Sequence, residues 1–400
     1  MTAMLLWLAL GLVAFSYVFY PLTLAVWGGA HDLVGALRFL GGGRDRRDRS
    51  GPVEWPTVTL VVAAFNEEGC IRDKIRNSLA LEYPADRLEI LVGCDACTDR
   101  TAAVAREAGG ARVRVVELAP RSGKASVLGR LVPASMGDVV VLTDANVMLD
   151  PGALRALARR FADPSVGAVV GRLRLQNPTN GEFEEGIYWK YETLVKHLEG
   201  KRGCVLGANG GLYAIRRILF GPLPSDTITD DFVIPVRIAV RGWRVPFEPM
   251  AVAYEETTED TREEFGRRAR IGAGNWQALA RVPDVLDPRT RFVFFAFVSH
   301  KLLRWATPLL LPFALLASAA LAAGPGAWGY RLLLALQLGF YALALAGWSG
   351  RAAGPLRRLA SLAHYFVAMN VALAVGFWRF VRGTQNPAWK RTDRTAARAA

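Results

Sequence analysis

Residues 139–150 read VVVLTDANVMLD, and this stretch decides the fold class. Four aliphatic residues followed by a polar turn predict a buried strand, with Asp144 and Asn146 near its end. Similar strand-like runs alternate with amphipathic segments before and after it. Strands are expected at 57–64, 88–92, 113–118 and 166–175, and helices at 70–81, 98–107, 124–132, 181–199, 230–241 and 261–280. This alternation predicts an α/β domain with a mostly parallel, Rossmann-like sheet.

Asp144 and Asn146 are candidate metal ligands. Sheets of this type bind ligands beyond the carboxyl ends of their strands, where these two side chains lie. Their oxygens suit a hard divalent cation such as Mg²⁺ or Mn²⁺, whose remaining ligands would come from a diphosphate and water. The alternative is an Asx turn that closes the strand.

Three further polar motifs follow expected strands or open a helix. Asn66 and Glu67 in the FNEE motif, and Asp95 in DACTDRT, can accept hydrogen bonds from a uracil-type base and from ribose. Each of them could equally cap a helix. Lys124 in the GKA turn lacks the first glycine of a P-loop, yet it can reach a pyrophosphate.

Asp230 and Asp231 open the helix expected at 230–241. A general base for group transfer needs a carboxylate aimed at an acceptor hydroxyl, and Asp231 is the candidate. The alternative is that both carboxylates only stabilise the helix N-terminus. Asp230 is a candidate for substrate binding. Further candidates lie in a GANGG loop and in a basic helix, whose charges could also simply be solvated: Asn209, Arg267, Arg270 and Trp276.

Four stretches are apolar enough to cross a membrane, although the chain is 52% hydrophobic and 21% charged overall. A span needs about 20 apolar residues. The first stretch is expected to be a retained anchor, because no basic region precedes it and basic residues follow, whereas a signal peptide shows the reverse. The last stretch could instead lie along the membrane. The four stretches are 1–30, 305–323, 330–349 and 359–378.

The positive-inside rule gives the orientation. Arginines after the first stretch place the following domain in the cytoplasm, so the protein is expected in the inner (plasma) membrane. The tail is also basic and should lie inside, but a spanning 359–378 would put it outside. Either that segment lies along or re-enters the membrane, or another apolar stretch, such as 292–298, completes an even number of spans. The expected parts are an anchor at 1–30, a linker at 31–51, a cytoplasmic domain at 52–285, an interfacial helix at 286–304, a transmembrane region at 305–381 and a basic tail at 382–400.

The net charge of +13 raises the question of nucleic acid. No nucleic-acid motif is present, and the basic residues lie mostly beside apolar spans, so membrane lipids are the expected partner. Cys94 and Cys97 form a CxxC pair without a completing set of ligands, so zinc is not expected. The four cysteines all fall in the part assigned to the cytoplasm, where reduced thiols are expected.

In their order along the chain, these motifs resemble those of family 2 glycosyltransferases with a GT-A fold. They resemble in particular the membrane-bound β-glycosyltransferases of the poly-N-acetylglucosamine, hyaluronan and cellulose synthase kind. The resemblance implies that Asp95 and Lys124 bind the nucleotide, that Asp144 and Asn146 bind the metal and diphosphate, and that Asp231 is the base. The motifs are FNEE 65–68, DACTDRT 95–101, GKA 123–125, TDAN 143–146, GANGG 207–211, TDD 229–231 and RRAR 267–270.

Three departures from the family pattern stand out. Asn146 replaces the usual second aspartate of the metal motif, which lowers the negative charge there. Asp230 replaces the glutamate that usually precedes the base. The QxxRW signature of processive synthases appears as RRARI at 267–271, which puts processivity in doubt, although Trp276 could supply the lost aromatic ring.

The resemblance implies an inverting transfer from a UDP-sugar to a carbohydrate or lipid acceptor, with a β-linked product. Two acceptors stay open: a growing polysaccharide, whose export could involve an accessory subunit, and a lipid that receives one sugar. The aromatic helix at 181–199 suits the first, and the altered signature suits the second. A third hypothesis, from another class, is an inactive membrane scaffold or nucleotide-binding regulator.

Overall fold

The computed structural model describes residues 1–29, 54–176, 187–256, 261–354 and 356–385. The expected linker at 31–51, the start of the aromatic helix at 181–199 and most of the basic tail lie outside these ranges. The chain divides into two compact units, and each is described by itself. The α/β unit comprises 23–259 and 278–295, and the helical unit comprises 1–22, 260–277 and 296–385.

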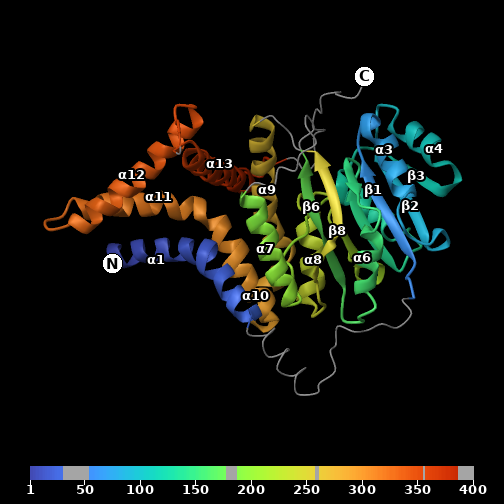
Figure 1. The fold of residues 1–400 in the computed structure, drawn as a ribbon, viewed down its shortest axis with the longest axis horizontal. Coiled ribbons are helices and arrows are strands. Elements are labelled where there is room, and N and C mark those ends of the chain that lie inside the picture. The colour runs from blue at the N-terminus through green and yellow to red at the C-terminus, as the bar shows by residue number, and fades with distance from the viewer. Residues whose placement is uncertain (30–53, 177–186, 257–260, 355, 386–400) are drawn as a thin grey trace, which may run out of the picture. The chain divides into compact units, whose positions relative to one another are not determined.

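The α/β unit contains an eight-stranded sheet with the order β3-β2-β1-β4-β7-β6-β8-β5. Figure 1 labels β1, β2, β3, β6 and β8 of this sheet. The pairs among β1 to β4 are parallel, as is β6–β8, whereas β4–β7, β6–β7 and β5–β8 are antiparallel. The strands are β1 Val58–Ala64, β2 Leu88–Asp95, β3 Val113–Leu118, β4 Val139–Asp144, β5 Val147–Leu149, β6 Ala168–Gln176, β7 Tyr213–Arg216 and β8 Phe247–Glu256.

The α/β class and the parallel first half of the sheet are confirmed. The sequence patterns missed three strands, so the second half is more mixed than expected. β5 has only three residues, β7 has four and follows a glycine-rich loop, and β8 contains Pro249. Each of these features weakens the local pattern from which a strand is predicted.

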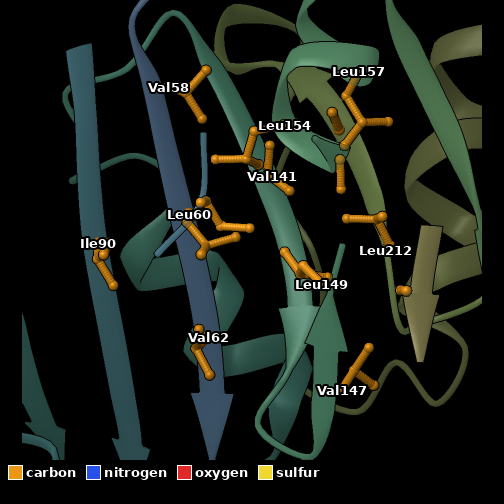
Figure 2. Packing of buried hydrophobic residues seen from close by; sticks show 14 of the residues in the cluster. Val58, Leu60, Val62, Ile90, Val141, Val147, Leu149, Leu154, Leu157 and Leu212 are labelled. Carbon is orange, nitrogen blue, oxygen red and sulfur yellow. The ribbon is translucent and has the colours of Figure 1, made fainter. Parts of the chain in front are cut away.

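Helices cover both faces of the sheet. One face buries side chains of β1 and β2 against α3 and α6, and Figure 2 shows Leu60, Val62, Ile90 and Leu154 in this core. Burying one such aliphatic side chain contributes about 1.5–3 kcal/mol. The helices of this unit are α3 Glu68–Leu79, α4 Thr101–Gly109, α5 Lys124–Leu131, α6 Ala153–Arg160, α7 Ile187–Lys201 and α8 Asp230–Val240.

The other face depends on a glycine. α5 packs on β2 at Gly93, where an added Cβ would lie 2.6 Å from Val127 and 2.5 Å from Leu131. Such distances are shorter than any ordinary contact, so only glycine lets α5 approach the sheet this closely. The position of α5 matters for the site, because the helix begins with Lys124.

The helical unit contains several long apolar helices, some of which extend a few residues beyond its bounds. Their elements are α1 Thr2–Ala14 with a π-helical turn Phe15–Phe19, α9 Thr261–Arg281, α10 Phe292–Ala296, a second π-helical turn Phe297–Leu302, α11 Leu303–Ala322, α12 Trp328–Trp348 and α13 Leu356–Val381. Among the residues that the structure describes, four helices are long and apolar enough to cross a membrane: Thr2–Gly29, Phe292–Ala322, Trp328–Trp348 and Leu356–Val381.

The segment 286–304 differs from the separate interfacial helix that the sequence suggested. Short 3₁₀ turns occupy Pro283–Leu286 and Pro288–Thr290, and Arg291 has a left-handed backbone with φ 51°. These residues interrupt the helix, which starts only at Phe292 and then continues into α11. Pro288 at a helical first turn is tolerated, but it stops any helix that arrives from before it.

We expect Gly93→Ala to destabilise the α/β unit by about 1–3 kcal/mol, because the new methyl group overpacks the β2–α5 contact. Gly129→Ala is the matched control on α5, since its nearest neighbour would lie 4.0 Å away. That control should keep or raise stability by up to about 1 kcal/mol. Thermal unfolding of the detergent-purified variants checks both, and equal melting temperatures for the two variants would contradict the assigned packing.

Candidate active site

Three carboxylates and one ammonium group converge at the carboxyl edge of the parallel strands. Lys124 Nζ lies 2.6 Å from Asp144 Oδ1 and 3.6 Å from Asp230 Oδ2. Asp144 ends β4, Lys124 starts α5, and Asp230 and Asp231 start α8. Segments from three parts of the chain thus place charged groups at one point, where the sheet topology predicts ligand binding.

Gly210 lies beside this charged cluster and adds no side chain to it. A Cβ at residue 210 would lie 3.3 Å from Asp144 Oδ2, 3.5 Å from Lys124 Nζ and 3.8 Å from Asp231 Oδ2. The loop is held in place by the Ala208 N–H, which donates to the carbonyl of Asp231 at 2.8 Å. A side chain at residue 210 would therefore press against the charged groups, and glycine avoids this contact.

The electrostatics of the cluster favour a base at Asp231. Removal from water and the neighbouring Asp230 raise the pKa of Asp231 to about 6, and Asp144 acts in the same direction. Lys124 and Lys196 oppose this rise. For Lys124, burial lowers the pKa, but the surrounding carboxylates outweigh burial and raise it above its usual value. Lys124 therefore stays charged, while Asp231 titrates just below neutral pH.

Asp95 holds the turn that precedes Lys124. Its fully buried carboxylate accepts hydrogen bonds from the backbone N–H groups of Ser122 and Gly123, both at 2.8 Å. A buried carboxylate satisfied by backbone donors is rigid. Asp95 thus contacts the lysine turn directly, and its predicted role toward a nucleotide stays a prediction.

The FNEE and DACTDRT motifs lock into each other. Asn66, which has a left-handed backbone with φ 53°, accepts from Thr98 N at 2.8 Å and donates to Thr98 Oγ1 at 3.0 Å. The backbone N–H of Glu67 donates to Thr101 Oγ1 at 2.8 Å. Asp99 accepts from the backbone of Thr101 at 3.0 Å, a local role of the kind that the alternative interpretation proposed for this motif.

Asn146 lies beside a carboxylate that sequence reasoning did not single out. Its Nδ2 donates to Glu255 Oε1 of β8 at 3.3 Å. This contact joins β5 and β8, which are far apart in the sequence but paired in the sheet. Glu255 therefore restores a negative charge close to the position where the family pattern has its second aspartate.

Three other residues support the site and were also missed. Lys196 of α7 donates to Asn209 Oδ1 at 2.5 Å, and Tyr213 of β7 donates to Asp230 Oδ2 at 3.4 Å. The fully buried Lys74 of α3 donates to Thr143 Oγ1 at 3.1 Å and to the carbonyl of Val147, so it holds both ends of the TDAN turn. No local motif marks these residues, because their partners are distant in sequence.

The predicted residues of the basic helix belong to the helical unit. Arg267 lies 3.8 Å from Glu264 on α9. Trp276 packs against Phe377 and Trp305, with ring centroids 5.0 and 6.2 Å away. Arg270 lies on the same helix. The proposed contacts of Arg267, Arg270 and Trp276 with substrate therefore remain predictions.

The donor set fits a divalent metal only together with a ligand. Within the described ranges, no group of three His, Cys, Asp or Glu side chains is placed to hold a metal ion. Asp144 and Asn146 offer oxygen atoms, and Gly210 lies next to Asp144. Diphosphate oxygens and water would have to complete the coordination, as hard cations in nucleotide sites commonly require.

A family model described as glycosyltransferase like family 2 matches residues 56–274, more than half of the chain. The chain belongs to this family. The poly-β-1,6-N-acetyl-D-glucosamine synthase of Staphylococcus aureus (strain MSSA476) is 26% identical over 231 residues, which cover 56% of each chain. The β-monoglucosyldiacylglycerol synthase of Synechocystis is 28% identical over 236 residues, 56% of this chain and 49% of the relative.

The matches thus span about half the length of these curated relatives. A solved structure matches nearly the whole chain: the mannosyltransferase PcManGT from Pyrobaculum calidifontis, in complex with GDP-Man and Mn²⁺. Its TM-score is 0.65 at 25% identity, over 94% of this chain and 99% of that one. This likeness confirms the GT-A fold, and the metal in that complex is Mn²⁺.

We expect Gly210→Val to weaken Mn²⁺ binding in the presence of a nucleoside diphosphate by at least about tenfold, or about 1.4 kcal/mol. The valine side chain would press against Asp144 Oδ2 and Lys124 Nζ and displace them. Gly266→Val on α9 is the control, since an added Cβ there meets nothing within 4 Å. Titration of Mn²⁺ followed by electron paramagnetic resonance checks this. Unchanged affinity in Gly210→Val would show that the surroundings of Gly210 are not part of the binding site.

Proposed function

We propose that the protein is a membrane-bound, inverting glycosyltransferase that moves a sugar from a nucleotide-sugar to a lipid or polysaccharide acceptor with a β-linkage. The observation that carries the proposal is the convergence of Lys124, Asp144 and Asp231 around Gly210. A cation, a diphosphate-binding group and a base are the parts that such a transfer requires.

Asp231 acts as the base in this proposal. With a pKa of about 6, it is mostly deprotonated at neutral pH and basic enough to take a proton from an acceptor hydroxyl. The acceptor oxygen then attacks the anomeric carbon opposite the leaving diphosphate, which inverts the configuration. Tyr213 and Lys124 hold the neighbouring Asp230, so the start of α8 stays fixed.

Lys124 and a metal act on the leaving group. The lysine, freed from Asp144, is positioned to bind a diphosphate oxygen. Asp144 and Asn146 would hold Mg²⁺ or Mn²⁺, which when bound supplies positive charge to the departing nucleoside diphosphate. We propose a UDP-sugar as donor; GDP-mannose is the competing donor, because it is bound in the solved mannosyltransferase.

The acceptor favoured here is a lipid that receives a single sugar. One curated relative is named as a glycolipid synthase and another as a polysaccharide synthase. Trp276, the residue that could replace the lost aromatic of the processive signature, packs against Phe377 and Trp305. A ring engaged in helix packing is poorly suited to stacking on a growing sugar chain.

The location follows from the same proposal. The α/β unit would lie in the cytoplasm, where nucleotide-sugars are made, and the protein would be a multi-pass protein of the inner (plasma) membrane. An accessory subunit for export is proposed only for the polysaccharide alternative, since a single glycolipid product needs no such partner.

The decisive test incubates detergent-purified protein with UDP-sugars and GDP-mannose, Mg²⁺ or Mn²⁺, and native membrane lipid. Nucleotide release and the size of the labelled product are measured. A lipid carrying one sugar supports the favoured acceptor, and a long polymer supports the synthase alternative. Failure of every donor with both metals would overturn the enzyme proposal in favour of the scaffold.

Asp231→Asn should lower turnover by about 10²–10⁴, the usual contribution of a general base, while donor binding stays close to that of the parent. The amide has nearly the same shape but cannot accept the proton. Turnover is followed by nucleotide release and binding by calorimetry with the nucleoside diphosphate. An Asp231→Asn variant of normal activity would exclude this residue as the base.

The activity should depend on pH through Asp231. Its raised pKa means that the active, deprotonated form is lost as the pH falls through about 6. Lys196→Met removes a positive charge that lowers the pKa of Asp231, so the acidic limb of the pH–activity profile should move to higher pH. Lys190→Met, on the exposed side of the same helix, should leave the limb in place. Identical profiles for both variants would refute the coupling.

A further inference from the structure

The apolar helix α13 has an ambiguous relation to the membrane. Its residues 359–378 carry no Asp, Glu, Lys or Arg, so composition alone allows a crossing. A crossing would separate its two ends by the roughly 30 Å of hydrocarbon. The contacts of α13 within the helical unit therefore decide whether its ends lie on one side or on two.

α11 and α12 form an antiparallel hairpin. Gln337 Nε2 donates to Ser318 Oγ at 2.8 Å, and Arg331 Nε donates to the carbonyl of Ala322 at 3.0 Å. Later residues of α12 therefore contact earlier residues of α11. α12 therefore returns to the side from which α11 began, and its last residue, Trp348, lies on that side.

The start of α13 is packed against this end of α12. A Cβ added to Gly347 would lie 2.3 Å from the carbonyl of Ala360, so the two helices approach closely there. The intervening turn contains Arg351, and Arg357 follows in the first turn of α13. α13 thus begins on the side where α11 begins.

The other end of α13 is packed against α9. A Cβ added to Gly376 would lie 2.4 Å from the carbonyl of Ala269, and one added to Gly272 would lie 3.2 Å from Leu373 Cα. α9 carries Glu264 and several arginines, which exclude it from hydrocarbon. The end of α13 therefore lies at the level of a charged helix.

The contact between Trp276 and Trp305 indicates the depth of α9 relative to the membrane. Its ring contacts Trp305, which is the first residue of the uncharged run 305–323 on α11. Because that run is just long enough to fill the hydrocarbon, Trp305 lies at its edge on the side where α11 begins. Both ends of α13 are thus tied to the same edge of the membrane.

The middle of α13 also stays within the half of the membrane next to this edge. The Phe366 ring lies 5.6 Å from Tyr17, and Arg304 stacks over Tyr17 at 5.0 Å. Phe366 contacts Phe340 as well, at 5.9 Å. Phe340 is eight residues before the end of α12, a depth of about 12 Å at 1.5 Å per residue, which is less than half the hydrocarbon thickness.

We propose that α13 does not cross the membrane but lies within the single leaflet next to α9, bound to lipid. Its exposed apolar side chains, Leu359, Leu362, Val371 and Trp378, face acyl chains. Arg382 stacks over Trp378 at 4.4 Å, the pairing of an aromatic ring and a cation that is typical of the headgroup level. Anionic headgroups are the partners that match the arginines at both ends.

Single cysteines test the proposal. Thr384→Cys reports the end of α13, Ala353→Cys the turn before it and Ala323→Cys the turn between α11 and α12. Right-side-out and inside-out vesicles are treated with a membrane-impermeant maleimide, and the labelled residue is identified by peptide mass spectrometry. We expect residues 384 and 353 to react in the same vesicles and residue 323 in the opposite ones.

Labelling of Thr384→Cys together with Ala323→Cys would overturn the proposal, because α13 would then span. The result does not depend on sugar transfer, so the topology and the proposed function fail separately. The parent protein, with its own four cysteines, sets the background.

Discussion

The ion pair between Lys124 and Asp144 is the interaction on which the site depends. At about 4 Å and an effective dielectric constant of 20, two opposite unit charges attract each other by about 4 kcal/mol before the cost of removing them from water. Here one ammonium group faces both Asp144 and Asp230. Without it, the carboxylates at the end of β4 and the start of α8 would repel each other. The same arrangement suits a ligand exchange in which a diphosphate and a cation replace the internal ion pair.

The fold explains why these groups meet. Parallel pairing of β1, β2 and β4 brings the ends of three separate strands to one edge of the sheet. Gly93 lets α5 pack closely on β2, which sets the position of Lys124, and Asp95 fixes the turn before that helix. A glycine and a buried carboxylate that are not members of the charged cluster thus help to set its geometry.

The sequence predicted the parts of the fold whose signals are local. Strands β1 to β4 and the motifs at their ends follow from short aliphatic runs, so Asp144 and Lys124 were found. Lys196 and Glu255 were not, because their contacts with Asn209 and Asn146 arise from pairings between distant segments. Periodicity carries no information about such pairings, and the mixed second half of the sheet was missed for the same reason.

The helical unit shows the limit of composition as a guide to topology. An uncharged run of 20 residues is long enough to span a membrane, but its length alone does not determine on which side of the membrane each end lies. For α13 this depends on two glycines, Gly347 of α12 and Gly376 of α13 itself. Each permits a close backbone approach that holds one end of α13 against a neighbouring helix. The basic tail, which conflicted with four spans by the positive-inside rule, agrees with three spans and one helix in the leaflet. Charge and packing, which are independent observations, then lead to the same topology.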